Sequence, residues 1–132
     1  MTNSIEPIKI VCTDDEDSIL RLVRAYISVC AQKPNTRVYG GHSKSELVDL
    51  VREHNPKMII TDKDMEREDI ALEGIKEIRE ILKYETPVIL MSGNMNGAEE
   101  KLKDLKDISY LIKPFNLSSF KETMKAAYPD YF

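Results

Sequence analysis

The chain of 132 residues has the length of one domain with a single core, and it is too short for two such domains. Its composition, 42% hydrophobic and 32% charged, excludes disordered and fibrous proteins. The net charge of −4, with no long run of basic residues, argues against direct binding to nucleic acid or to a membrane surface.

The N-terminus and the cysteines give no sign of export. No basic stretch is followed by an apolar one at the N-terminus, and no apolar run approaches membrane length. We therefore expect a cytoplasmic protein with one domain over residues 1–132 and a short flexible lead-in at residues 1–7. Cys12 and Cys30 have neither the spacing of a zinc site nor that of a redox pair, which predicts buried or half-buried thiols.

Short apolar runs alternate with segments of helical period along the whole chain. The predicted strands are residues 8–13, 36–40, 58–61, 87–91 and 109–112. Several of them are apolar on both faces, as in strands that helices cover on both sides. Apolar stripes predict helices around residues 19–27, 47–51, 72–82, 98–105 and 117–124. Ser43 and Glu46 are spaced as a capping box, and Asp69 is placed to cap the third helix.

This alternation predicts an α/β fold, a doubly wound (βα)5 sandwich with a five-stranded parallel sheet and helices on both faces. Ligands of such sheets bind beyond the carboxyl ends of the strands. The residues that follow the strands are therefore candidates for a site: Asp14 and Asp15 after the first, Asp62 after the third, Ser92 after the fourth and Lys113 after the fifth.

Each of these residues alone has an ordinary structural explanation, such as a helix cap or a turn. Together they place three carboxylates at one edge of the sheet, where two like charges about 4 Å apart repel by roughly 4 kcal/mol at an effective dielectric of about 20. Such a cluster needs a raised pKa or a cation, and oxygen ligands suit Mg²⁺.

The other side chains at this edge suit a transferring phosphoryl group. The hydroxyl of Ser92 and the ammonium of Lys113 are donors for phosphoryl oxygens, and Asp62 is the carboxylate best placed as a nucleophile. The sequence therefore predicts magnesium-assisted phosphoryl transfer to an aspartate.

Four segments, IVCTDDED, NPKMIITDKDM, TPVILMSG and SYLIKPF, resemble in order and spacing the receiver domain of two-component response regulators. The resemblance extends from Lys9 to about Tyr128. It implies the flavodoxin-like strand order 2-1-3-4-5 and a signalling protein that promotes its own aspartate phosphorylation and slow dephosphorylation. A chain that ends at Phe132, soon after the last helix, leads us to expect a stand-alone, chemotaxis-regulator-like receiver, with a fragment of a larger regulator as the alternative.

The resemblance also implies a metal site and a phosphoryl donor. Asp62 would take its phosphoryl group from a phosphohistidine of a sensor kinase or of a phosphotransfer protein. Asp15 and Asp62 would bind Mg²⁺ directly, Asp14 would act through a water molecule, and the backbone carbonyl of Asp64 would complete the protein ligands.

The output mechanism follows from the same resemblance. Ser92 and Lys113 would hold the phosphoryl oxygens, and the peptide bond between Lys113 and Pro114 would be cis. Ser92 would move toward the phosphoryl group, and Tyr110 would turn inward as the aromatic switch. The face formed by the fourth helix, the fifth strand and the fifth helix would then bind a downstream protein.

The chain departs from the family pattern after the acceptor. Glu66 stands where the family usually has proline, and Gly74 matches a family glycine only if the loop is longer by about four residues, around 67–70. We expect Lys63 and Asp64 to flank the acceptor on its exposed side. The longer loop is either functional or only a solvated insertion.

Two residues near the acceptor correspond to family positions that border the path of the attacking water. They are Asp64, two positions after the acceptor, and Asn94, two positions after Ser92. We expect them to set the lifetime of the phosphoryl group.

Two other functions fit parts of the sequence. The DKD at Asp62 resembles the DxD motif of haloacid-dehalogenase-type phosphatases, which also use a hydroxyl, a lysine and Mg²⁺. Those enzymes place a further acidic motif after the lysine, whereas only Glu122 and Asp130 follow Lys113 here, so chain order favours the receiver. A receiver-like scaffold that binds a partner without phosphorylation ranks lower, because every side chain that the chemistry needs is present.

Overall fold

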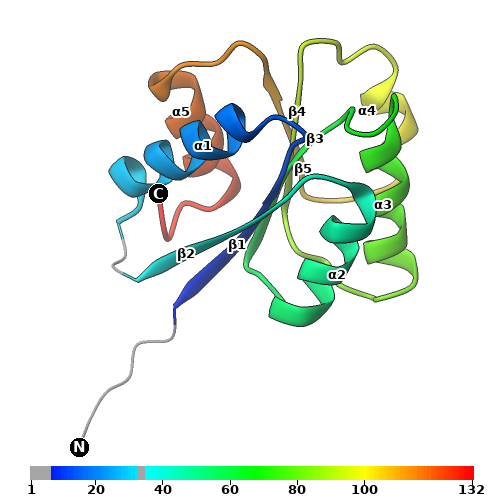
Figure 1. The fold of residues 1–132 in the computed structure, drawn as a ribbon, viewed down its shortest axis with the longest axis horizontal. Helices are drawn as coiled ribbons and strands as arrows, with labels where there is room; N and C mark the ends of the chain where they lie inside the picture. The colour runs from blue at the N-terminus through cyan, green and yellow to red at the C-terminus, as the bar shows by residue number, and fades with distance from the viewer. Residues whose placement is uncertain (1–6, 33–34) are drawn as a thin grey trace, which may run out of the picture.

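The computed structural model of the protein describes residues 7–32 and 35–132, in which strands and helices alternate (Figure 1). The strands are β1 (Ile8–Thr13), β2 (Thr36–Gly41), β3 (Met58–Asp62), β4 (Val88–Ser92) and β5 (Ile108–Ile112). The helices are α1 (Asp17–Cys30), α2 (Lys44–His54), α3 (Ile70–Glu80), α4 (Ala98–Lys101) and α5 (Leu117–Ala127). Of the expected lead-in, residues 1–6 lie outside the described residues.

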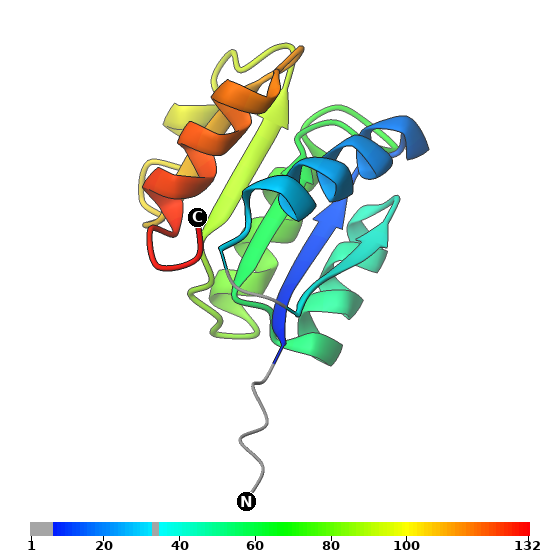
Figure 2. The same cartoon turned by 90° about the vertical axis from the view of Figure 1, so that its left-hand side faces the viewer.

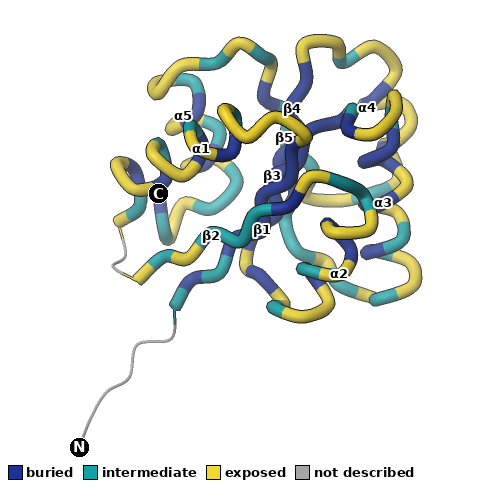
Figure 3. The backbone as a smooth tube through the Cα atoms, viewed as in Figure 1, coloured by how far each residue is buried: buried dark blue, intermediate teal, exposed yellow. Residues whose placement is uncertain are grey.

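The strands form one parallel sheet in the order β2-β1-β3-β4-β5, which confirms the predicted doubly wound fold and its strand order. Helices α1 and α5 cover one face of the sheet, and α2, α3 and α4 cover the other (Figures 1 and 2). The central strands β3 and β4 are buried along their whole length, which explains why both read as apolar on two faces (Figure 3).

Two apolar cores result, one on each face of the sheet. The core under α1 and α5 includes Val23, Ile60 and Phe120, and the core under α2, α3 and α4 includes Leu47, Ile75 and further apolar side chains. Cys12 and Cys30 are buried and free, as predicted. Burial, with the charge of Asp14 as the next cause, raises the pKa of the Cys12 thiol to about 12.

The helix starts agree only in part with the predicted caps. The Ser43 hydroxyl accepts a hydrogen bond from the backbone N–H of Glu46, which is one half of a capping box. In the other half, the Glu46 carboxylate accepts from the backbone N–H of His42 instead of that of Ser43. Asp69 stands at the N-cap position of α3, as predicted, but its side chain makes no capping hydrogen bond. Asp69 has a left-handed backbone with φ of 59°, and its carboxylate does not bind the start of α3, because two lysines hold it elsewhere.

Gly74 in α3 and the short helix α4 are two local features of the face opposite α1 and α5. Gly74 lies inside α3, where an added Cβ would come within 3.1 Å of a Leu47 methyl group, so the glycine lets α3 approach α2 closely. Helix α4 is a single turn, shorter than its apolar stripe predicts. Among residues 7–32 and 35–132, no helix is both long and apolar enough to cross a membrane.

Phe120 provides a direct test of the core beneath α1 and α5. It is fully buried, and its ring lies 5.5 Å from that of Tyr26 and 6.0 Å from that of Phe115. Phe120→Ala should lower the free energy of unfolding by about 3–5 kcal/mol, because it opens a cavity among packed aromatic rings. Urea unfolding followed by circular dichroism measures it. Val29→Ala, at a position that is 70% exposed, is the control and should change stability by less than about 0.5 kcal/mol.

Candidate functional site

The candidate site lies at the carboxyl ends of β1, β3 and β5. Asp14 follows β1 and Lys113 follows β5, whereas Asp62 is itself the last residue of β3. The backbone N–H of Asp14 donates to the carbonyl of Gly41, and that of Lys113 donates to the carbonyl of Ser92. Sheet hydrogen bonding therefore continues past the strand ends and fixes the backbone that carries the two side chains.

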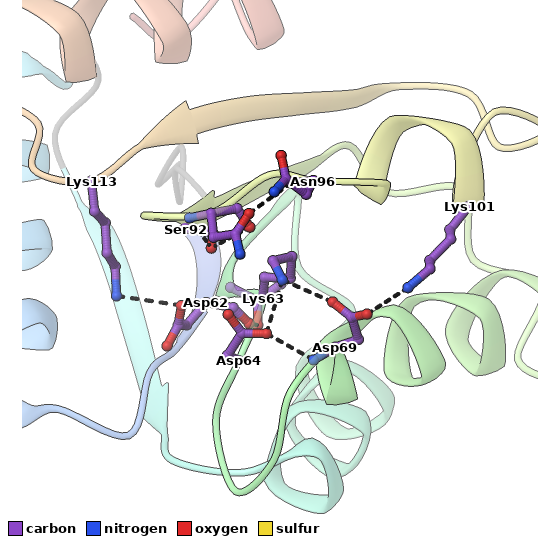
Figure 4. A network of polar contacts seen from close by, with 10 residues as sticks. Asp62, Lys63, Asp64, Asp69, Ser92, Asn96, Lys101 and Lys113 are labelled. Carbon is purple, nitrogen blue, oxygen red and sulfur yellow. Dashed lines mark hydrogen bonds and ion pairs between the residues drawn. The ribbon is translucent and has the colours of Figure 1, made fainter.

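Three carboxylates meet at this edge, as the sequence predicts. One oxygen from each of Asp14, Asp15 and Asp62 lies within 4.8 Å of the others. Asp14 and Asp62 are buried, and Asp15 is exposed. The ammonium of Lys113 lies 2.8 Å from Asp14 Oδ2. It also lies 3.3 Å from Asp62 Oδ1 (Figure 4). One cation is thus shared between two buried acids.

The pKa values of Asp62, Asp15 and Lys113 are all raised, but for different reasons. Burial, and then the charge of Asp14, raises the pKa of Asp62 to about 6, against the lowering effect of Lys113. Burial and the neighbouring Asp14 also raise the pKa of Asp15. Burial by itself would lower the pKa of Lys113, but its hydrogen bond to Asp14 and the charge of Asp62 outweigh burial and raise it.

The cluster suits a divalent cation. Its donors are all carboxylate oxygens, which are the ligands that Mg²⁺ prefers, and Asp15 is open to solvent where water ligands are available. Burial and the charge of Asp14 together outweigh the lowering effect of Lys113 on the pKa of Asp62, so a further cation would stabilise the ionised cluster. The residues present therefore fit a magnesium ion.

Ser92, Asn94 and Asn96 are linked by hydrogen bonds at the carboxyl end of β4. The hydroxyl of Ser92, the last residue of β4, donates to the carbonyl of Asn94 and accepts from its N–H, so it is bound to the loop that follows the strand. The Asn94 side chain is exposed and accepts from the N–H of Asn96. Tyr110 is half-buried and packs against the core under α2, α3 and α4. The peptide bond between Lys113 and Pro114 is cis, as the resemblance implies.

Lys63 contradicts the expectation that it lies on the exposed side of the acceptor. It is 1% exposed, and its ammonium lies 3.0 Å from Asp64 Oδ1 and 2.8 Å from Asp69 Oδ1. Asp69 in turn binds the ammonium of Lys101 on α4 at 2.6 Å (Figure 4). Burial would lower the pKa of Lys63, but the hydrogen bonds to the two carboxylates outweigh burial and raise it. Asp64, by contrast, is partly exposed, as expected.

The sequence pattern gives no signal for this network, because a lysine that follows a strand usually extends into solvent. Nor is the loop a simple solvated insertion. Glu66, at the position where the family usually has proline, accepts from the backbone N–H of Lys44 at the start of α2 at 3.0 Å. Met65 is buried among the apolar side chains beneath α2 and α3. The loop between β3 and α3 is therefore held to α2 and α4 as well as to the sheet.

The comparisons with known proteins agree with this geometry. The model of the response regulator receiver domain matches residues 10–125, so the chain belongs to the response regulator receiver domains, the signalling modules of two-component systems. No curated protein matches the chain in sequence.

Solved structures share the fold at low identity. The Vibrio cholerae chemotaxis protein CheY4 has a TM-score of 0.78 at 20% identity, over 92% of this chain and 99% of that one. The receiver domain of the sensor histidine kinase PA1611 from Pseudomonas aeruginosa has a TM-score of 0.73 at 18% identity, over 92% of this chain and 97% of that one. That structure has a magnesium ion coordinated in its active site cleft.

The raised pKa of Asp62 predicts a pH-dependent effect of Asp62→Asn. Because the folded pKa of about 6 lies above the ordinary 3.8, Asp62 opposes folding once it is ionised, and the stability present below 3.8 is lost as pH rises through about 6. Asparagine removes this cost. The free energy of unfolding should rise by about 2 kcal/mol at pH 8 and change little at pH 4.

Urea unfolding of the parent and of Asp62→Asn at the two pH values, without added divalent cations, measures this difference. Asp49→Asn on the exposed side of α2 is the matched control, since its side chain is 72% exposed. An equal gain at both pH values would contradict the assignment of the cost to ionised Asp62.

Proposed function

We propose that this chain is a phospho-accepting receiver in which Asp62 takes a phosphoryl group from the phosphohistidine of a sensor kinase or of a histidine phosphotransfer protein. The observation that carries the proposal is the position of the Asp62 carboxylate, at the end of a fully buried central strand and between Asp14 and the ammonium of Lys113. A rigid strand end presents the nucleophile with little freedom to misalign.

The chemistry is an in-line transfer. An Asp62 carboxylate oxygen forms a bond to phosphorus while the bond between phosphorus and the histidine nitrogen breaks, and that nitrogen keeps the electron pair. Lys113 binds the phosphoryl oxygens, and Ser92 turns toward them from its own loop. Mg²⁺ held by Asp14, Asp15 and Asp62, with the backbone carbonyl of Asp64, would supply positive charge to offset the phosphoryl oxygens.

Output follows from the charge that the phosphoryl group adds. A group of roughly two negative charges on Asp62 draws the hydroxyl of Ser92 out of its loop, and Tyr110 turns into the space behind β4. The face formed by α4, β5 and α5 then binds a downstream protein. This face carries exposed apolar side chains suited to such a contact, since Ile112 is 64% exposed and Leu117 is 37% exposed.

Intact-protein mass after incubation with acetyl phosphate or phosphoramidate tests the proposal. The parent should gain one phosphoryl group of about 80 Da in the presence of Mg²⁺, because a nucleophilic carboxylate receives it and the metal offsets the charge. The gain should fall at least tenfold without Mg²⁺ and be absent in Asp62→Asn.

The controls separate the alternative functions. Asp49→Asn, on the exposed side of α2, should gain the group like the parent. A gain that survives in Asp62→Asn would refute Asp62 as the acceptor. No gain in any variant, without magnesium binding, would favour a receiver-like scaffold and make a partner pull-down the next measurement. Rapid turnover of a simple phosphate ester would favour a phosphatase.

We further propose that Asp64 and Asn94 set the lifetime of the phosphoryl group. Both lie in the loops that flank the acceptor, and polar side chains there orient or exclude the water that attacks phosphorus. Once the donor is removed, Asp64→Ala or Asn94→Ala should change the dephosphorylation rate severalfold. The loss of the mass gain with time measures it, and parent-like rates for both variants would refute this role.

A further inference from the structure

The chemistry proposed for Asp62 assigns no role to Lys63, although Lys63 follows the acceptor directly. Lys63 is 1% exposed and is one of the largest fully buried side chains among the described residues. A lysine is rarely buried unless its charge is paired, so its two close carboxylates explain why it is tolerated there. The same pairing also restricts Asp64 and Asp69, two acids in the loop after Asp62.

The ammonium of Lys63 fixes the carboxylate of Asp64. Asp64 Oδ1 accepts from Lys63 Nζ at 3.0 Å and from the backbone N–H of Asp69 at 2.7 Å. Two donors on one oxygen, one of them charged and buried, hold the side chain against the loop (Figure 4). An Asp64 carboxylate held in this way is not free to turn toward a water molecule at Asp62.

A second carboxylate, that of Asp69, also holds the Lys63 side chain in place. Asp69 Oδ1 binds Lys63 and Asp69 Oδ2 binds Lys101 of α4, so one carboxylate bridges two ammonium groups. The backbone of Lys63 also extends the sheet, because its N–H donates to the carbonyl of Met91 and its carbonyl accepts from the N–H of Ala71. Both ends of the lysine are therefore fixed, and the Asp64 carboxylate is fixed with them.

We propose that Lys63 is a positioning residue that restrains the Asp64 carboxylate in the loop after β3 and so slows loss of the phosphoryl group from Asp62. This inference rests on the proposed function of Asp62. In the step that it slows, a water oxygen bonds to phosphorus, the bond from phosphorus to the Asp62 oxygen breaks, and inorganic phosphate leaves. A released Asp64 carboxylate hydrogen-bonds that water and accepts its proton.

A double-mutant cycle tests the restraint. The parent, Lys63→Met, Asp64→Ala and the double variant are loaded with phosphoramidate and Mg²⁺, the donor is removed, and phosphoryl loss is followed by intact mass. Lys63→Met should lose the group at least threefold faster than the parent, because methionine fills the same space without holding Asp64. The double variant should lose it at the rate of Asp64→Ala, since no carboxylate is left to release.

Two matched variants complete the cycle. Lys103→Met replaces an exposed lysine near α4 that pairs only with Glu100 among the described residues, and it should keep the parent rate. Asp69→Asn, at a partly exposed position, removes one carboxylate that holds Lys63 and should give a smaller acceleration that also vanishes with Asp64→Ala. This variant decides the question if Lys63→Met does not fold.

Hydrogen exchange of the Asp69 amide gives a second measurement that does not depend on phosphorylation. That amide donates to Asp64, so its exchange should be at least fivefold faster in Lys63→Met than in the parent. Parent-like rates of both exchange and phosphoryl loss would overturn the inference, as would an acceleration that persists with Asp64→Ala. A parent that is not phosphorylated on Asp62 would refute the proposed function, while exchange would still decide whether Lys63 restrains the loop.

Discussion

The site depends on one ammonium group shared by two buried carboxylates. Strands β1 and β3 pair with Thr13 opposite Thr61, and the two hydroxyls are hydrogen-bonded at 2.7 Å. The next residue on each strand is an aspartate, so this register forces Asp14 and Asp62 side by side. Lys113 lies against both acids and acts to lower the pKa of Asp62, but burial and the charge of Asp14 outweigh this effect and raise it.

The sheet can hold repelling groups because the strands beneath them are fixed by the core. Strands β3 and β4 are buried throughout, and the apolar area beneath them supplies far more free energy than the few kcal/mol of repulsion at their ends. Ser92 is itself the buried last residue of β4, but its hydroxyl is bound to Asn94 in the segment that follows, and Tyr110 lies half-buried on an edge strand. The switch that we propose would move these two side chains while Asp62 stays fixed at the end of β3.

Sequence reasoning recovered the parts of the molecule that follow from local pattern and sheet topology. Apolar runs and helical stripes specify the alternation, and a parallel sheet necessarily brings the ends of its strands to one edge. The sequence alone therefore predicts that Asp14, Asp62 and Lys113 lie together. The spacing of Asp69 predicts a side-chain cap for α3, but two nearby ammonium groups attract its carboxylate more strongly than backbone N–H groups do.

The sequence also predicts wrongly that Lys63 is exposed, because its burial too depends on contacts that form only in three dimensions. Its position after an apolar strand says nothing about the direction of a long side chain, and its burial depends on acids that lie later in the loop and on another ion pair with α4. Such pairing is set by the backbone path of residues 63–69, which depends on a left-handed turn at Asp69 rather than on any repeating pattern. Single-residue spacing cannot reveal a network whose members are joined only in three dimensions.

The same network explains how the loop keeps its shape without a proline. Glu66, where the family pattern has the rigid residue, binds the backbone at the start of α2. Asp69, just before α3, binds Lys63 after β3 and Lys101 on α4. Salt screens the exposed members of this set, and it screens the buried ammonium of Lys63 much less. The loop between β3 and α3 is therefore ordered by charged contacts more than by covalent stiffness. Because a phosphoryl group on Asp62 adds charge at the edge of this loop, phosphorylation would act directly on the interactions that hold the loop in place.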